Sequence, residues 1–434
     1  MKYLLFLTYF LSSLYATDSV STWFLEGKTS GYIKYYYIET NKNYYQAQRT
    51  SAHSNAIGGL LKYNTSRLRG LQLNTTFMTT QGFLLPNNIE TSTLGQDEGK
   101  KGFNAKDAFS VLGEVNLDFT NQYINFWYGR KLINTPMIGP KSARMLPSTI
   151  EGGEGTIYIN EGTQFSLIYA DKFKQRSAAG FSNIIKHALG SDTLAVTGKD
   201  EGKTITASLK YKDDIVSLNV YNMYAPDFIN VAYVDFKYLE DFYSISAQAV
   251  SQASVGNAST NLAKSNSVTN GKKINANAIG IRGGLHYKQS SFDLVYRNIF
   301  RDKNSYDSII TPWDGSLLYA YSSTTNNLGQ SLYGNALTAG GAYVGGTQGL
   351  KFGYTQKYLG FKGLKTHIAL GIYRNSLYRE DQEDLKAILF YDTDNFSFQL
   401  KGIWIDNDTY TFKDGTVNQL DSLTQYHAIV TYKF

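Results

Sequence analysis

The sequence contains no cysteine, which excludes both a disulfide framework and a thiolate metal site. Proline is also scarce, with 6 residues in 434, and no proline-rich or serine-rich segment could serve as a linker. Length alone would allow two or three soluble domains, yet no domain boundary is visible. Short alternating segments run from Gly27 to the C-terminus, which favours one repeated architecture.

Long apolar runs are missing as well. The only candidate, at residues 3–11 after Lys2, is shorter than the roughly 20 residues that a membrane-spanning helix needs. One positive charge, a short apolar run and small residues near Ala16 are typical of a secretory signal. We predict a signal peptide at residues 1–16, cleaved within a few residues of Ala16 because Leu14 stands where a small residue is usual. The mature unit is then residues 17–434.

Strong charge of one sign is absent too. The net charge is +6, and no basic run or RNA-binding signature stands out. Together with the predicted export, this argues against a nucleic-acid partner. Aromatic residues make up 15% of the chain, yet its mean hydropathy is −0.31. Such an exported chain is either a soluble periplasmic protein or a β-barrel, whose membrane character lies in alternation.

The last nine residues show this alternation most clearly. Tyr426, Ala428, Val430, Tyr432 and Phe434 alternate with His427, Ile429, Thr431 and Lys433. A transmembrane β-strand needs about 9 to 11 residues. A strand that ends in Phe, with apolar residues at every second position before it, resembles the closing strand of outer-membrane barrels, which the assembly machinery reads. An amphipathic edge strand of a soluble sandwich is the alternative.

Alternating segments continue along the whole chain. The predicted strands are 31–39, 55–64, 70–79, 109–119, 122–131, 155–160, 163–171, 203–211, 215–223, 229–238, 242–251, 277–288, 291–299, 348–358, 365–375, 385–392, 396–405 and 425–434. A glycine-rich candidate at 336–344 would be a nineteenth, but bacterial single-chain barrels have even strand numbers. We therefore assign that segment to a loop and predict an all-β, 18-stranded antiparallel transmembrane barrel.

The connections support the barrel over the sandwich. Short ones, such as residues 120–121, 160–162 and 393–395, alternate with others that are mostly long. The long ones include residues 80–108, 132–154, 172–202, 252–276 and 300–347. Short periplasmic turns and long external loops are typical of outer-membrane barrels, and an even strand count places both termini on the periplasmic side.

Each strand divides into two faces, and charges keep off the apolar face in the clear cases. At 109–119 we assign Phe109, Val111, Val115, Leu117 and Phe119 to the lipid face, and Ser110, Glu114, Asn116 and Asp118 to the lumen. The charged positions assigned to the lumen are Lys34, Lys62, Lys210, Lys237, Arg282, Lys288, Arg297, Lys351, Lys357, Lys401 and Lys433, against Glu114, Asp118, Asp235 and Asp293. This excess predicts a net basic lumen, which favours anions.

Short motifs in a particular order carry a family resemblance. Residues 23–65 include Gly31-Tyr32-Ile33-Lys34-Tyr35 and Ala56-Ile57-Gly58-Gly59-Leu60. Later come Tyr128-Gly129-Arg130-Lys131, Thr135-Pro136, Ser142-Ala143-Arg144-Met145-Leu146-Pro147 and Tyr358-Leu359-Gly360-Phe361-Lys362-Gly363-Leu364. With the C-terminal strand, this order resembles the OprD-type porins of Gram-negative bacteria. The resemblance implies an 18-stranded barrel, a pore narrowed by the third and seventh loops, and a ladder of basic residues on the wall.

The segment 133–149 matches the family's constriction loop in position. Pro136, Gly139, Pro140 and Pro147 stiffen it, and Lys141 and Arg144 give it positive charge. Our hypothesis is that it folds into the lumen and sets Arg144 opposite Glu114 and Asp118; an ordinary surface loop is the alternative.

Two features complicate the resemblance. Arg130 and Lys131 are also expected at the pore, but Arg130 is in phase with Phe126 and Tyr128, so an inward orientation needs a bulge or a position above the membrane. Much of the expected ladder is Lys rather than Arg, which leaves fine substrate specificity open.

No catalytic constellation, metal-ligand spacing among the five His or phosphate-binding glycine loop is present. We predict a passive channel without cofactors for small hydrophilic solutes, with carboxylates or amino acids as the expected class. A surface adhesin or structural barrel is the alternative. The expected partners are outer-membrane lipid and lipopolysaccharide, the solutes, and the barrel-assembly machinery through the C-terminal strand. The chain would act as a monomer or homotrimer in the cell outer membrane.

Overall fold

The computed structural model describes residues 17–44, 49–83, 108–140, 144–262, 269, 271–318, 343–376, 381–406 and 420–434. The predicted signal peptide at 1–16 and the predicted site residue Lys141 lie outside these residues. So does most of the glycine-rich candidate at 336–344.

Nineteen strands and a few short helices make up the described chain. The strands are β1 (Lys28–Tyr44), β2 (Thr50–Asn64), β3 (Leu71–Gly82), β4 (Phe109–Thr120), β5 (Ile124–Lys131), β6 (Thr149–Tyr158), β7 (Thr163–Lys174), β8 (Ser182–Asn183), β9 (Thr204–Lys212), β10 (Val216–Ala225), β11 (Ile229–Leu239), β12 (Tyr243–Ser254), β13 (Asn275–Tyr287), β14 (Ser290–Ile299), β15 (Gln348–Lys357), β16 (Leu364–Arg374), β17 (Gln382–Asp392), β18 (Phe396–Asp406) and β19 (Leu420–Lys433). The helices are α2 (Thr17–Leu25), α3 (Ile184–Leu189), η1 (Gly190–Asp192), α4 (Thr193–Thr197) and α5 (Ala258–Asn261).

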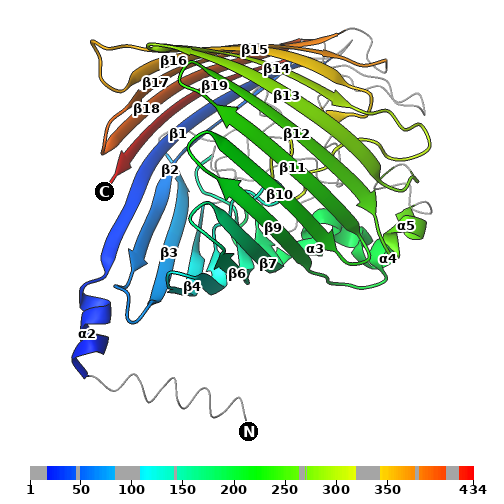
Figure 1. Ribbon diagram of the computed structural model, residues 1–434. Coiled ribbons are helices and arrows are strands. Elements are labelled where there is room, and N and C mark those ends of the chain that lie inside the picture. Colours follow the sequence, from blue (N-terminus) through cyan, green and yellow to red (C-terminus); the bar gives the residue numbers. More distant parts are fainter. Residues whose placement is uncertain are drawn as a thin grey trace.

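The long strands form one closed barrel (Figure 1). Each pairs antiparallel with its neighbours, and β1 pairs with both β2 and β19. The two-residue β8 pairs only with β7, while β7 also pairs with β9. Eighteen long strands therefore close the wall, which confirms the predicted fold class. Closure leaves no edge strand, so the backbone N–H and C=O groups of the wall find their hydrogen-bond partners within the protein.

The outward face of the wall is apolar. On β13 and its neighbours, Ile281, Leu294 and Phe352 are 51%, 53% and 47% exposed, as lipid-facing side chains of a barrel are. Aromatic residues gather towards the strand ends, with Tyr287 and Tyr128 also exposed. Among the described residues, no helix is long and apolar enough to cross a membrane.

The predicted faces of β4 are wrong in its first half. A register shift between Thr76 and Phe77 marks a β-bulge at Gly113, because Thr76 pairs with Glu114 and Phe77 with Leu112. The extra residue reverses the alternation. Phe109 is buried inside the barrel and Leu112 is exposed on the outside, whereas Glu114, Asn116 and Asp118 face inward as predicted.

Turns and loops lie at opposite ends of the barrel. Helix α2 marks the turn end, where Trp23 Nε1 donates to Leu71 O at 3.2 Å beside the β2–β3 turn. Helices α3, α4 and α5 belong to loops of the other end. The connection between β10 and β11 at this end is short, with only residues 226–228, in line with the predicted strands 215–223 and 229–238.

Phe434 closes the barrel at the turn end. Its backbone exchanges hydrogen bonds with Gly31, at 2.9 Å and 3.1 Å, while its ring remains 47% exposed. Burial of the ring therefore contributes only part of the roughly 1.5–3 kcal/mol of stability that a fully buried Phe side chain contributes. The resemblance of the last strand to the closing strands of outer-membrane barrels predicts a further role for Phe434 in assembly.

Deleting Phe434 should lower the amount of folded, heat-modifiable barrel in the outer membrane far more than this burial implies. The measurement is the ratio of folded to unfolded bands in membrane fractions, with Phe434→Tyr as the aromatic control. Normal folded levels of the truncated chain would contradict the idea.

Candidate pore constriction and basic row

The connection between β5 and β6, residues 132–148, is called loop 3 here. Its Arg144 and Met145 carbonyls accept hydrogen bonds from Lys34 Nζ at 2.8 Å and from the Tyr32 hydroxyl at 2.9 Å. Lys34 and Tyr32 belong to the inward face of β1, because they alternate with Ile33, which is 52% exposed on the outside. Loop 3 therefore folds into the lumen, as hypothesised.

Arg144 is held deep in this contact. It is only 4% exposed, and its Nη1 donates to the hydroxyl of Tyr36 on β1 at 2.8 Å. The same hydroxyl lies 2.7 Å from Nδ1 of His427 on β19. The Arg144 charge also repels that of Lys401 on β18. The tip of loop 3 thus brings a cation to the wall where the barrel closes.

Loop 3 is joined to loop 4 (residues 175–203) and loop 7 (residues 300–347) at Asp314. The Ser148 hydroxyl donates to Asp314 Oδ2 at 2.6 Å, and Arg176 Nη1 lies 3.5 Å from Oδ1. Gly139 N donates to Trp313 O at 3.1 Å, and Trp313 Nε1 donates to Ile184 O at 2.8 Å. Three loops that are distant in sequence are therefore fastened together.

Apolar side chains of these loops pack against the inner wall and stabilise the arrangement. They include Met137, Ile138, Ile184, Ile185, Ile310, Trp313 and Leu317, which form one buried cluster with wall residues such as Trp127, Met223 and Val231. His187 of α3 lies in this region, 4.7 Å from the Phe173 ring. Burial lowers the pKa of His187, opposed by the nearby Asp314 carboxylate, so the imidazole stays neutral at pH 7.

Basic side chains line the inner wall from β18 to β13, and Arg144 of loop 3 lies beside them. We call Arg144, Lys401, Lys386, Lys351 and Arg282 the basic row. Lys401 stands directly across from His427, and its charge is repelled by those of Lys386 and Arg144. Lys386 is repelled in turn by Lys351, and Lys351 by Arg282. Each cation of the basic row therefore interacts electrostatically with the next one along the wall.

Two carboxylates accompany the row. Arg282 Nη2 lies 3.4 Å from Asp293 Oδ1, and both Asp293 and Asp384 attract the charge of Lys351. Glycines of the neighbouring strands leave room for them. A Cβ at Gly353 would stand 2.7 Å from an Asp293 oxygen, and one at Gly371 would stand 2.7 Å from an Asp384 oxygen. The two carboxylates thus balance part of the charge of the row.

Glu114 and Asp118 lie inside the barrel, but they are not brought into contact with Arg144. Glu114 accepts hydrogen bonds from Thr76 at 2.6 Å and from Leu132 N at 2.9 Å, with Lys62 Nζ at 3.8 Å. Asp118 pairs with Arg67 at 2.8 Å and with Lys131 at 3.2 Å. Both acids are therefore engaged by cations of their own wall.

Arg130 takes a different place from the predicted one. It pairs across the sheet with Glu151, Nε to Oε2 at 2.8 Å, in phase with the exposed Tyr128 and Phe126. No bulge interrupts β5 to turn it inward. The structure therefore places Arg130 on the outward face of the barrel.

The remaining predicted cations differ in how exposed their side chains are and in where they lie on the wall. Arg297 is 1% exposed, with its guanidinium 5.7 Å and 5.0 Å from the ring centroids of Tyr343 and Tyr373. Lys210 lies 5.6 Å from the ring of Tyr221 on the opposite side of the barrel from the row.

Lys386 was missed by the sequence analysis. Its alternation with Leu385 and Ala387 in the predicted strand 385–392 could have revealed it.

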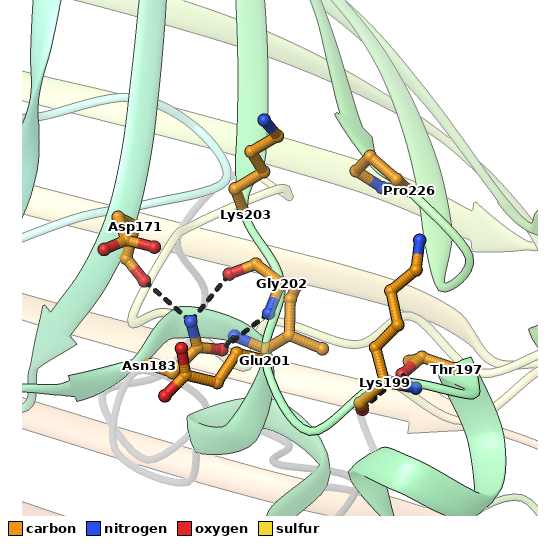
Figure 2. A pocket seen from close by; sticks show the side chains of 9 residues that line it. Asp171, Asn183, Thr197, Lys199, Glu201, Gly202, Lys203 and Pro226 are labelled. Atoms are coloured by element: carbon orange, nitrogen blue, oxygen red, sulfur yellow. Dashed lines mark hydrogen bonds between the residues drawn. The ribbon is translucent and has the colours of Figure 1, made fainter.

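One pocket lies away from the row, at the loop end between β7 and β9. It has a volume of about 260 Å³ and is lined by Asp171, Lys199, Glu201, Lys203 and others (Figure 2). The Asn183 side chain ties its walls together, donating to Asp171 O at 3.3 Å and to Gly202 O at 2.8 Å. Within the described chain, no group of three His, Asp or Glu residues could hold a metal ion.

A closed barrel of eighteen long strands, apolar outside and carrying loops folded into its interior, has the architecture of an outer-membrane porin. No protein-family model matches the sequence. No curated protein matches it either.

Solved porins of the OprD/Occ type have a similar fold. Three from Pseudomonas aeruginosa illustrate the likeness: OccK9 (OpdG), with a TM-score of 0.72 at 13% identity; OccK2 (OpdF) in complex with glucuronate, 0.69 at 13%; and OpdK with vanillate, 0.68 at 14%. Each comparison covers 95% of this chain and 99% of the other. The fold is thus shared over nearly the full length.

Proposed function

We propose that this chain is an OprD-type outer-membrane porin through which small hydrophilic anions, carboxylates above all, diffuse passively. The observation that carries the proposal is the basic row, which continues from Arg144 in the constriction to Arg282 on β13. Two of the similar porins were solved with vanillate and with glucuronate, which are both carboxylates. The resemblance extends the proposal to outer-membrane lipid and the assembly machinery as partners, and to a monomer or homotrimer.

The row would act by replacing water around a carboxylate in stages. Lys and Arg groups spaced along a wall lower the energy of an anion, and the low-dielectric protein around them strengthens their field. Conduction also requires that each site release the solute. Asp293 and Asp384 weaken the attraction of Lys351 and Arg282 locally, so an anion would move along the row instead of being trapped.

Loops 3, 4 and 7 narrow the remaining space. Their buried apolar cluster covers the inner wall from β5 to β14, and loop 3 reaches across to β1. A solute must then pass beside the basic row, where a small cross-section raises the effect of each charge because less water screens it.

Liposome swelling with two solutes of similar size tests the proposal. Vesicles containing the purified protein should swell several-fold faster in sodium glucuronate than in glucose, since only glucuronate carries a charge that the row attracts. Equal rates would contradict anion preference. No swelling in either solute would indicate an adhesin or structural barrel.

A further inference from the structure

Three charged side chains form a cluster on the outward face near the loop end. Arg130 Nε lies 2.8 Å from Glu151 Oε2, and Lys172 Nζ lies 2.6 Å from Glu151 Oε1. The side chains are 37%, 28% and 42% exposed, respectively. One carboxylate thus holds two cations side by side, one on each of its oxygens. We call Arg130, Glu151 and Lys172 the rim cluster.

A β-bulge turns Lys172 to this face. The register between β6 and β7 shifts so that Glu151 pairs with Lys172 and Gly152 pairs with Ala170, which leaves Asp171 as the extra residue. Without the bulge, Lys172 would share the inward face of Ala170, because alternate residues point to the same side. Bulges commonly re-aim side chains in this way, and Phe173 returns to the buried inner side.

Aromatic side chains mark the level of the cluster. Tyr128 precedes Arg130 by two residues on β5, and Tyr169 precedes Lys172 by three residues on β7. Both tyrosines thus lie closer to the middle of the wall, and they are 65% and 37% exposed on the outward face. Exposed tyrosines of this kind belong to the girdle at the membrane–water interface. Phe181 of loop 4 covers the other side, with its ring 4.5 Å from the Arg130 guanidinium. The cluster therefore sits at the height of lipid headgroups.

We propose that the rim cluster binds a phosphate group of an outer-leaflet lipid headgroup. This inference rests on the proposed membrane location, since the loop end of a porin faces the outer leaflet. Arg130 uses Nε for Glu151, and among the described residues its two Nη groups have no hydrogen-bond partner. A guanidinium edge beside an ammonium matches a phosphate, which accepts several charge-assisted hydrogen bonds.

The setting explains why the charges are kept on the lipid side. Lys or Arg at mid-membrane depth on this face would destabilise the barrel, whereas near the interface the cost becomes small. Lys203, directly before β9, adds a third cation, with Nζ 5.7 Å from the centroid of the Tyr169 ring. Glu151 and Asp171 offset part of this charge, so attraction depends on the placement of Arg130 and Lys172 more than on net charge.

The test compares Arg130→Gln/Lys172→Gln with a matched control in the full-length purified barrel. The control is Arg374→Gln, because Arg374 Nε makes the same kind of ion pair, 2.7 Å from Asp381 Oδ2, outside the cluster. The probe is bisphosphorylated lipid A in detergent micelles, with dephosphorylated lipid A and inorganic phosphate as the other arms, followed by native mass spectrometry.

The double variant should bind bisphosphorylated lipid A roughly 30-fold more weakly, since each basic residue near an anionic lipid surface contributes about 1 kcal/mol. Arg374→Gln should bind like the wild type, and dephosphorylated lipid A should bind weakly to all three proteins. Equal binding by double variant and control would overturn the proposal, and so would tighter binding of free phosphate than of lipid A.

Heat-modifiability of each variant confirms folding, and planar-bilayer conductance is measured in parallel. Because the rim cluster faces away from the lumen, the double variant should conduct as the wild type does. If all proteins conduct and the double variant binds lipid A as the control does, only the lipid site is rejected. If none of the proteins conducts, the proposed channel is rejected.

Discussion

Replacing Lys386 and Lys401 together by Glu is expected to reverse the proposed anion selectivity, so that the channel prefers cations. Both lysines are central to the basic row, and each lies within electrostatic reach of the other. Even in water, a unit charge about 4 Å from a permeating ion changes its energy by about 1 kcal/mol. Reversing two such charges should therefore change the anion-to-cation permeability ratio by at least about tenfold.

The measurement is the reversal potential in a planar bilayer under a salt gradient. The matched control is Lys199→Glu/Lys203→Glu, which reverses two lysines at the loop end outside the lumen. Lys199 is an exposed partner of Asp227, and Lys203 lies against the outward-facing Tyr169. If the row governs selectivity, only the first double variant shifts the reversal potential. Equal shifts, or none, would show that the selectivity does not lie in the row.

Asp314→Ala should release loop 3 and give a larger, noisier conductance. The substitution removes the acceptor of Ser148 and leaves Arg176, whose side chain is 10% exposed, without its counter-charge. Breaking a buried ion pair by removing one partner costs roughly 3–5 kcal/mol. The substitution should therefore weaken the contact between loops 3, 4 and 7 and leave the barrel wall itself unchanged.

Asp314→Asn is the control for this prediction. Asp314 has a φ of 58°, a conformation that Asn tolerates better than Ala does. Asn also keeps an acceptor for Ser148 and loses only the charge. Its conductance should therefore lie between those of the wild type and Asp314→Ala. A wild-type conductance in the Ala variant would show that Asp314 does not hold the constriction.

The barrel could be predicted from the sequence because its rules are local. Alternation in 426–434 and elsewhere follows from the two faces of a strand, and the difference between turn and loop lengths follows from the two sides of the membrane. The same rule failed on β4, where the bulge at Gly113 reverses the alternation and places Phe109 inside. A glycine within a strand permits a bulge without requiring one.

The candidate site was predictable only in part. Loop 3 was expected in the lumen from its stiffness, charge and position. Its partner was not, because the contact between Arg144 and Tyr36 joins residues 108 positions apart. The phase of Arg130 with Tyr128 already indicated the outward face that the structure shows. Lys386 could have been found by sorting its strand, whereas its electrostatic interaction with Lys351, two strands away, depends on how β15, β16 and β17 align.

Recording single channels of the purified wild-type protein in a planar bilayer, with a gradient of potassium chloride, tests the anion-channel proposal most directly. Stable open steps are expected, with a reversal potential that shows chloride to be more permeant than potassium, because the proposed solute path runs beside the basic row. The absence of open steps, or a reversal potential that shows preference for potassium, would contradict the proposal.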